Sequence, residues 1–130
     1  LRRGVLARRG LARLRAADAH REIFLATQPG LEAALYDEVR AHRFRAAKAV
    51  AGGVTVNGTW ADAWRANLLL RGASRVLMRV ATFRAPHLSD LERSARAVPW
   101  RDILRPDVPV TVEATCRGSR IYHSGAASER

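Results

Sequence analysis

The feature that most constrains the fold is a regular succession of apolar patterns that begins at Glu22. Residues 23–27 (IFLAT) form a short apolar run, which predicts a strand. Pro29-Gly30 then opens a helix, because proline is tolerated in the first helical turn, where its missing N–H would have no partner. The apolar side chains of this helix recur at helical spacing and are expected on one face: Leu31, Ala34, Leu35 and Val39.

A β-hairpin is predicted after this helix. Residues 44–50 read as its first strand and Gly52-Gly53 as its tight turn, and Val54 and Val56 alternate as the second strand. Asn57-Gly58 is a typical turn pair, so we expect the hairpin to end there.

A second helix is predicted from Thr59, a good N-cap residue, with Asp62 three positions later in a pattern close to a capping box. We expect its tryptophans to pack in the core rather than to stack on bases, because they lie four residues apart on the apolar face. Gly72 should close the helix in the left-handed conformation. The predicted apolar face comprises Trp60, Ala63, Trp64, Asn67 and Leu68.

The β-rich residues 74–84 complete a β-α-β-β-α-β order between Ile23 and Arg84. This order is typical of the split βαβ, ferredoxin-like arrangement. The fold class predicted from the pattern alone is therefore α+β with a ferredoxin-like domain.

A second unit is predicted after Pro86. A helix is expected over Leu88 to Val98 with Ser89 or Asp90 near its cap, and Pro99-Trp100 interrupts it, with Trp100 anchoring the unit. Asp107 to Thr115 alternates as a strand, and residues 124–130 resemble the first turns of a further helix. One helix, one strand and part of a helix do not close a core, so we expect this unit to be incomplete. The apolar face of the predicted strand comprises Val108, Val110, Val112 and Ala114.

Charge points to a polyanionic partner. The chain of 130 residues has a formal net charge of +11, and Lys48 is its only lysine. A strongly basic chain attracts phosphate backbones and releases their counterions on binding. Ordinary solvation of the surface by arginine is the alternative reading of the same charge.

Residues 1–21 are rich in arginine and alanine and poor in acids. An organelle transit peptide and a nucleic-acid-binding arm both have this composition. A disordered leader or a misassigned start is the interpretation that we favour, so this segment is left out of the fold prediction.

The remaining composition narrows the class of protein. The single cysteine, Cys116, excludes an internal disulfide framework and a multi-cysteine metal site, and it fits a reducing cytosol. No apolar run approaches the roughly 18 residues of a membrane-spanning helix. We therefore expect a soluble, cytoplasmic protein without a metal site, in which Cys116 follows a strand and is structural.

Several segments together resemble the THUMP-containing RNA methyltransferases. They are IFLATQPGLEAALYDEVRA, AVAGGVTVNGTWADAWRANLLLRGASRVLMRVATF and AVPWRDILRPDVPVTVEATCRGSRIYHSGAASER, within which PGLE, GGV and LLLRGASRVLMRV carry most of the likeness. The family consists of class I S-adenosylmethionine-dependent enzymes. The similar branch methylates the exocyclic amine of a guanine in large-subunit ribosomal RNA.

This resemblance implies a domain order. Residues 22–85 would be the ferredoxin-like domain that precedes THUMP in this family, and residues 86–130 the first half of the THUMP domain. The family's Asn/Asp-Pro-Pro-Tyr-type catalytic motif is absent from the sequence, as is a Gly-rich cofactor loop after a strand. The resemblance therefore implies no catalytic or cofactor-binding residue in this chain, whereas it implies S-adenosylmethionine for the full-length enzyme and ribosomal RNA as the partner.

The first candidate RNA-binding site lies at the exit of the predicted strand. Arginine presents forked donors to phosphates, and a helix N-terminus adds free N–H groups. The structural alternative is that the arginines are ordinary loop charges and the serine is a helix cap. The candidates are Arg117, Arg120, His123, Ser124 and Arg130.

A second basic patch, at the end of the first helix, comprises Arg40, Arg43, Arg45 and Lys48. Positive charge there also complements the helix dipole, and this is the interpretation that we favour.

Two other functions remain open. The same N-terminal half could belong to an RNA-modifying enzyme of different chemistry, such as a THUMP-bearing thiouridine synthase. A non-enzymatic basic interaction module is the second alternative, and it predicts a complete, protease-resistant domain that ends near Arg130.

Overall fold

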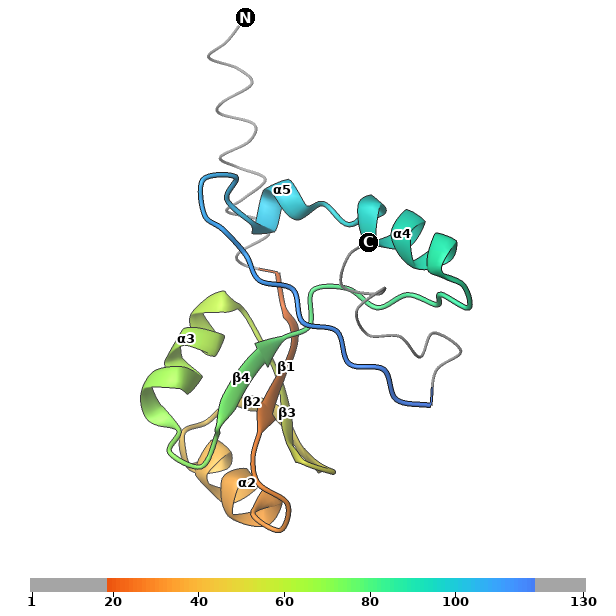
Figure 1. The fold of residues 1–130 in the computed structure, drawn as a ribbon. Helices are drawn as coiled ribbons and strands as arrows, with labels where there is room; N and C mark the ends of the chain where they lie inside the picture. Colours follow the sequence, from red (N-terminus) through yellow and green to blue (C-terminus); the bar gives the residue numbers. More distant parts are fainter. Residues whose placement is uncertain (1–18, 119–130) are drawn as a thin grey trace, which may run out of the picture. The chain divides into compact units, whose positions relative to one another are not determined.

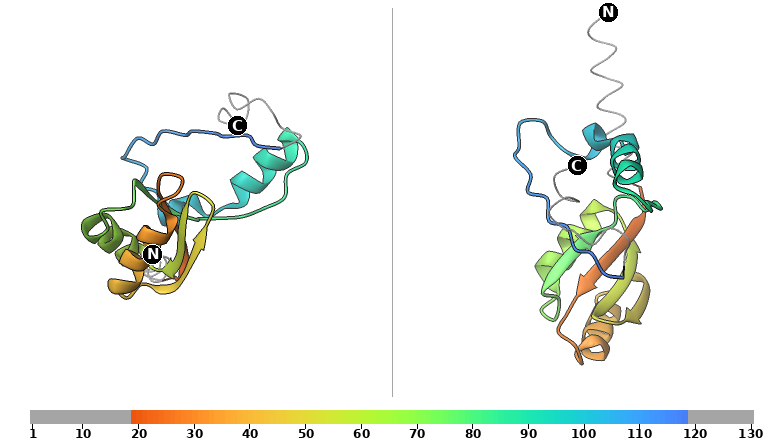
Figure 2. Two further views of the ribbon diagram at one scale, coloured as in Figure 1. Left: turned by 90° about the horizontal axis from the view of Figure 1, so that it is seen from below. Right: turned by 45° about the vertical axis from the view of Figure 1, so that its right-hand side comes forward.

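A computed structural model describes residues 19–118 of the chain. The chain divides between Val80 and Ala81 into two compact units, each of which is described by itself. Figures 1 and 2 show a sheet with helices in the first unit, and helices followed by extended chain in the second.

The first unit is a four-stranded sheet with the order β2-β3-β1-β4. Its strands are β1 (Arg21–Ala26), β2 (Arg45–Val50), β3 (Gly53–Gly58) and β4 (Arg75–Met78), and every neighbouring pair is antiparallel. Helix α2 (Glu32–Ala41) connects β1 to β2, and α3 (Trp60–Leu69) connects β3 to β4 (Figure 1). The predicted β-α-β-β-α-β ferredoxin-like fold is confirmed.

The core lies between the helices and one face of the sheet. Ile23 is opposite Val56 and Leu25 is opposite Val54, so the two central strands direct these four side chains to the same face. All four are at most 2% exposed, and Leu35 and Val39 of α2 are buried against them.

The start of α2 differs from the prediction. Gly30 has a φ of 92°, a left-handed conformation that glycine adopts without strain, and the helix begins only at Glu32. Leu31 is therefore the residue before the helix, and it is 51% exposed. Ala34 is also exposed, so the buried stripe of α2 is narrower than the four residues predicted.

The turn of the hairpin lies one residue earlier than predicted. Ala51 and Gly52 form the turn, with φ of 80° at Gly52, whereas Gly53 is already paired with Val50 in the ladder. The hairpin ends at Gly58 as predicted, but Asn57 and Gly58 do not form a turn, because both residues still pair with β1 opposite Glu22 and Arg21.

Helix α3 begins with the predicted capping box, in which the Thr59 N–H donates to the Asp62 carboxylate at 2.9 Å. The buried residues of the helix are Ala63 and Ala66, and Leu70 is buried just beyond its end. The predicted core position of Trp64 was wrong, since Trp64 is 69% exposed, and Trp60 is only half-buried. Small alanines allow the helix backbone to approach the sheet closely, which turns the bulky residues outward.

Two further predictions for this part of the unit were wrong. Gly72 does not close α3 in a left-handed conformation, because the helix ends at Leu69 with Leu70 extended. The fourth strand is shorter than residues 74–84, because its ladder with β1 ends at the Met78–Ile23 pair.

The second unit contains α4 (Leu88–Ala97) and α5 (Trp100–Ile103). Ser89 and Asp90 lie in the first turn of α4, near its N-cap as predicted, and the N-cap residue itself is His87. Trp100 ties α5 to α4, because its indole N–H donates to the Ala95 carbonyl at 2.6 Å.

The predicted strand over Asp107 to Thr115 was wrong, because these residues are extended chain without a ladder in the described structure. A strand requires a neighbour that pairs with its backbone, and none is present within residues 19–118. Val108, Val110 and Val112 are at least half exposed as a result.

Across the described residues, no helix has the length and apolar character needed to span a bilayer.

Candidate nucleic-acid interface

The first predicted RNA-binding cluster lies at the limit of the described chain. Arg117 is exposed in the extended segment that follows α5, and Gly118 beside it has a φ of 56°. The other four candidates, Arg120, His123, Ser124 and Arg130, lie outside residues 19–118. The cluster therefore stays a prediction. Cys116, next to Arg117, is half-buried and follows extended chain rather than the strand expected before it.

The second basic patch lies between the end of α2 and the edge strand β2. Arg40 is in the last turn of α2, Arg43 follows the helix with a φ of 58°, and Arg45 and Lys48 belong to β2. All four side chains are exposed, and no acid within the described part of the chain forms an ion pair with them. The Arg40 guanidinium lies 5.8 Å from the centroid of the Tyr36 ring.

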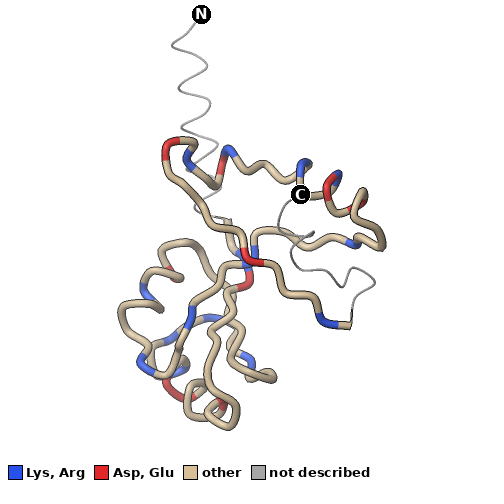
Figure 3. The backbone as a smooth tube through the Cα atoms, viewed as in Figure 1, with Lys and Arg blue, Asp and Glu red and all other residues tan. Residues whose placement is uncertain are grey.

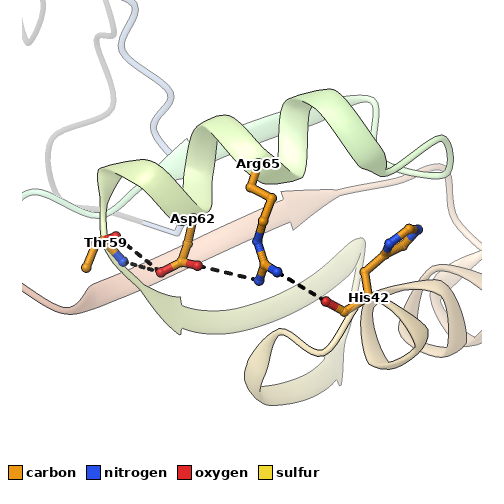
Figure 4. Close-up of polar contacts among 4 residues, drawn as sticks. All are labelled: His42, Thr59, Asp62 and Arg65. Carbon is orange, nitrogen blue, oxygen red and sulfur yellow. Dashed lines mark hydrogen bonds and ion pairs between the residues drawn. The ribbon is translucent and has the colours of Figure 1, made fainter.

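His42 contributes to this region through its backbone. Its carbonyl oxygen accepts a hydrogen bond from Arg65 of α3 at 3.4 Å (Figure 4). Arg65 also forms an ion pair with Asp62 at 3.5 Å, and its guanidinium lies 4.1 Å from the centroid of the Phe44 ring. Arg65 therefore joins the end of α2 to α3, and its role is structural.

Two acids of α2 are held by hydrogen bonds from backbone N–H groups. Glu38 accepts hydrogen bonds from the N–H groups of Arg71 and Gly72, at 2.8 and 2.9 Å, and so ties α2 to the loop before β4. Glu32 accepts hydrogen bonds from Gly30 and Gly52, at 2.7 and 3.1 Å, and so ties the start of α2 to the hairpin turn.

The described residues of the first unit carry a surplus of positive charge. Residues 19–80 contain nine cations, eight arginines and one lysine, against five acids. Lys and Arg recur along the first unit (Figure 3). Because carboxylates are engaged with backbone N–H groups, several cations stay free to meet an external anion.

The same contacts shift the pKa values of the carboxyl groups. Burial pushes the pKa of the Glu38 carboxyl upward, but the N–H groups of Arg71 and Gly72 together with electrostatic attraction from His42 and Arg71 outweigh it and leave the pKa below its ordinary value. Backbone N–H groups of Glu32 itself, Gly52 and Gly30 lower the pKa of the Glu32 carboxyl, and the Thr59 N–H lowers the pKa of Asp62.

We expect acidification to destabilise the first unit. A carboxyl group whose pKa is lowered on folding stabilises the native state above its unfolded-state pKa, and this stabilisation is lost as the pH falls through its folded-state pKa. The loss should therefore begin as the pH falls to about 4.5. Urea unfolding monitored by circular dichroism between pH 7 and pH 3 measures it.

Glu38→Gln should lower stability at neutral pH and flatten this pH dependence, because glutamine keeps the shape of the side chain without its charge. Asp37→Asn is the matched control, since Asp37 makes no such backbone contact within the described structure. Equal effects of the two substitutions would show that the Glu38 contacts do not stabilise the fold.

Comparison with known families shows what the first unit resembles. Residues 22–77 match the family described as the RlmL ferredoxin-like domain, and this is the segment that folds into the sheet. The first unit is similar to the RlmL ferredoxin-like domain.

Relatives of the whole chain are methyltransferases or methylases by name. The chain is 37% identical over 108 residues to the Ribosomal RNA large subunit methyltransferase K/L of Syntrophotalea carbinolica, covering 82% of this chain and 15% of that protein. A predicted N6-adenine-specific DNA methylase from Listeria monocytogenes superposes with a TM-score of 0.78 at 27% identity, over 95% of this chain and 30% of that one. SMU.472, which is assigned as a methyltransferase and was crystallised with SAH, shares the fold with a TM-score of 0.72 at 20% identity, over 85% of this chain and 29% of that one.

The chain spans less than a third of the length of each of these relatives. The resemblance seen in the sequence is confirmed for the RlmL ferredoxin-like domain and its fold. The boundaries at residues 21 and 85, and the assignment of residues 86–130 to half of a THUMP domain, stay predictions.

Among its described residues, the first unit offers no group of side chains that suits metal chemistry. Nowhere in residues 19–118 do three or more His, Cys, Asp or Glu side chains come together as a metal site would require. What the described surface does offer is exposed arginine and lysine, which suit contacts with phosphate.

Proposed function

We propose that this chain is the RNA-binding, N-terminal part of an S-adenosylmethionine-dependent methyltransferase that modifies large-subunit ribosomal RNA, with a guanine amine as the methylated group. The observation that carries the proposal is the match of residues 22–77 to the RlmL ferredoxin-like domain. The name of the Syntrophotalea relative supplies the substrate class, and SAH in SMU.472 agrees with the cofactor of such an enzyme.

The role within that enzyme is to hold structured RNA while another domain carries out methyl transfer. The net charge of +11 provides the electrostatic attraction, and exposed arginines provide phosphate contacts. Phosphate contacts orient a protein on RNA without reading its sequence. Binding should therefore depend on RNA shape and on salt more than on base sequence.

Binding of the 130-residue chain to a hairpin fragment of large-subunit ribosomal RNA tests this role, with fluorescence anisotropy measured at several salt concentrations. We expect affinity to fall steeply with salt. Arg117→Ala with Arg120→Ala should weaken binding and reduce the slope of log K against log salt by about 2, because each arginine is expected to neutralise one phosphate.

Arg93→Ala with Arg96→Ala is the matched control. It removes the same charge from α4, where Arg93 and Arg96 already form ion pairs with Asp90 and Glu92. Equal weakening of binding in both double variants would show that net charge, and not the cluster at Arg117, governs affinity. Replacing the six arginines before Asp18 with glutamine measures the share that residues 1–21 contribute.

A further inference from the structure

The sheet of the first unit has a second face, opposite the helices. Side chains alternate across a sheet, so each residue that pairs with an outward neighbour on the next strand shares this face. The register places three cross-strand rows on it: Val50–Gly53–Ala26–Arg75, Lys48–Thr55–Phe24–Leu77 and Arg45–Asn57–Glu22–Arg79. We call this surface the open sheet face.

An aromatic ring lies at the centre of the open sheet face. Phe24 is on β1, one of the two central strands, with Thr55 on one side and the 47% exposed Leu77 on the other. Gly53 leaves space beside the ring, since a Cβ atom at Gly53 would lie 3.0 Å from the Phe24 Cζ atom. The half-buried ring is therefore held over bare backbone and keeps part of its surface accessible.

Cations frame this ring on both edges of the sheet. Lys48 and Arg45 are on the edge strand β2, and Arg75 is on the opposite edge strand β4, all three exposed. The single acid in the three rows is Glu22, and Arg79 neutralises it in an ion pair at 3.0 Å. Four cations against one acid give the open sheet face a net positive charge.

We propose that the open sheet face binds single-stranded RNA, with a base stacked on Phe24 and the flanking phosphates held by Lys48 and Arg75. This inference rests on the proposed RNA-binding function and adds a second, separate surface to it. Stacking of bases on aromatic rings within a positively charged groove is the general means by which proteins bind single strands. Thr55 and Asn57 add hydrogen-bonding groups beside the ring, which suit base edges and ribose hydroxyls.

The arrangement favours an unpaired strand over other occupants. Bases inside a duplex are stacked on one another, so a ring in the middle of a sheet can reach only unstacked bases. An apolar protein surface would complement the ring but not the cations at both edges of the sheet. Single-stranded RNA, by contrast, complements both the ring and the charges.

The test compares two probes on the full 130-residue chain by fluorescence anisotropy: a labelled oligouridine of about ten nucleotides, within the usual range of single-strand site sizes, and the ribosomal RNA hairpin. Phe24→Leu should weaken oligouridine binding about 5- to 100-fold, the expected effect of removing the stacking of one base. Hairpin binding should change less than about twofold, because phosphate contacts at Arg117 do not need the ring. Phe24→Tyr should keep oligouridine binding, because tyrosine preserves the aromatic face.

Cation variants test the frame around the ring. Arg75→Ala should weaken oligouridine binding and reduce its salt slope by about 0.7, the value for one phosphate neutralised on a single strand. Arg93→Ala removes the same charge from α4, outside the open sheet face, where Arg93 forms an ion pair with Asp90, and should leave both quantities nearly unchanged. Thermal unfolding confirms that each variant is folded.

The outcomes separate the two proposals. If Phe24→Leu binds oligouridine as the parent chain does, the open sheet face is not a single-strand site, whereas a hairpin that still needs Arg117 and Arg120 leaves the proposed function standing. If neither probe binds, both proposals are wrong. A dimer in light scattering that Phe24→Leu dissociates would instead assign the face to self-association and overturn the inference.

Discussion

Replacing Gly53 with alanine is expected to lower the free energy of unfolding of the first unit by about 3 kcal/mol, the upper part of the range for overpacking a close contact. A Cβ atom at position 53 would lie 2.1 Å from the Leu25 carbonyl oxygen and 3.0 Å from its carbonyl carbon. Both atoms belong to the backbone of β1, which is paired with β3 on one side and with β4 on the other. The strands must therefore separate locally to admit the methyl group.

Gly52→Ala is the matched control in the same hairpin. A Cβ atom at Gly52 would meet no atom within 4 Å, but the φ of 80° is costly for alanine. We expect a decrease of about 1 kcal/mol in the free energy of unfolding from this backbone strain alone. Urea unfolding monitored by circular dichroism compares the two variants. If Gly53→Ala were no more destabilising than Gly52→Ala, the close approach of β1 and β3 at Leu25 would be wrong.

The order of elements in the first unit could be predicted because each segment shows its period clearly. Residues 23–27 form a short apolar run, and Val54 and Val56 alternate with Thr55, and both patterns are typical of strands. Thr59 and Asp62 predict the start of α3, because their capping box forms within four consecutive residues. Local signals of this kind need no knowledge of the tertiary structure.

The buried face of α3 could not be predicted in the same way. Trp60, Trp64 and Leu68 recur at helical spacing, and so do Ala63, Ala66 and Leu70. Hydrophobicity favours the first set, whereas the close approach of the helix to the sheet requires the second. Which set is buried depends on how far the sheet lies from the helix axis, and this distance is a property of the assembled fold.

The candidate sites, too, could be predicted from the sequence only in part. Clusters of arginine are visible in the sequence, and the patch from Arg40 to Lys48 is exposed as a surface charge should be. The open sheet face was missed because residues 23–27 read as one apolar run, in which Phe24 is not distinguished from Ile23 and Leu25. The strand over Asp107 to Thr115 failed for the complementary reason, since pairing is decided by a neighbour and not by the strand itself.

Leu25→Ala is expected to cost about 3 to 5 kcal/mol, whereas Leu68→Ala should change stability by less than about 0.5 kcal/mol. Leu25 is fully buried on a central strand, where removing its side chain leaves a cavity against Val54 and α2. Leu68 is 83% exposed on α3, so the same truncation there removes almost no packing. Both variants replace leucine with alanine, so they differ only in the environment of the side chain.

This comparison also decides the rotation of α3 about its own axis. If the apolar stripe of Trp64 and Leu68 faced the sheet, Leu68→Ala would destabilise the first unit about as much as Leu25→Ala. With Ala63 and Ala66 against the sheet, Ala66→Leu should instead cost about 1 to 3 kcal/mol by overpacking, and Trp64→Ala should cost less. Urea unfolding of the four variants, followed by circular dichroism because Trp64 is itself one of the fluorophores, distinguishes the two orientations. Since small residues at the interface are what bring α3 close to the sheet, a large cost at Ala66 together with a small one at Leu68 is the result that the fold requires.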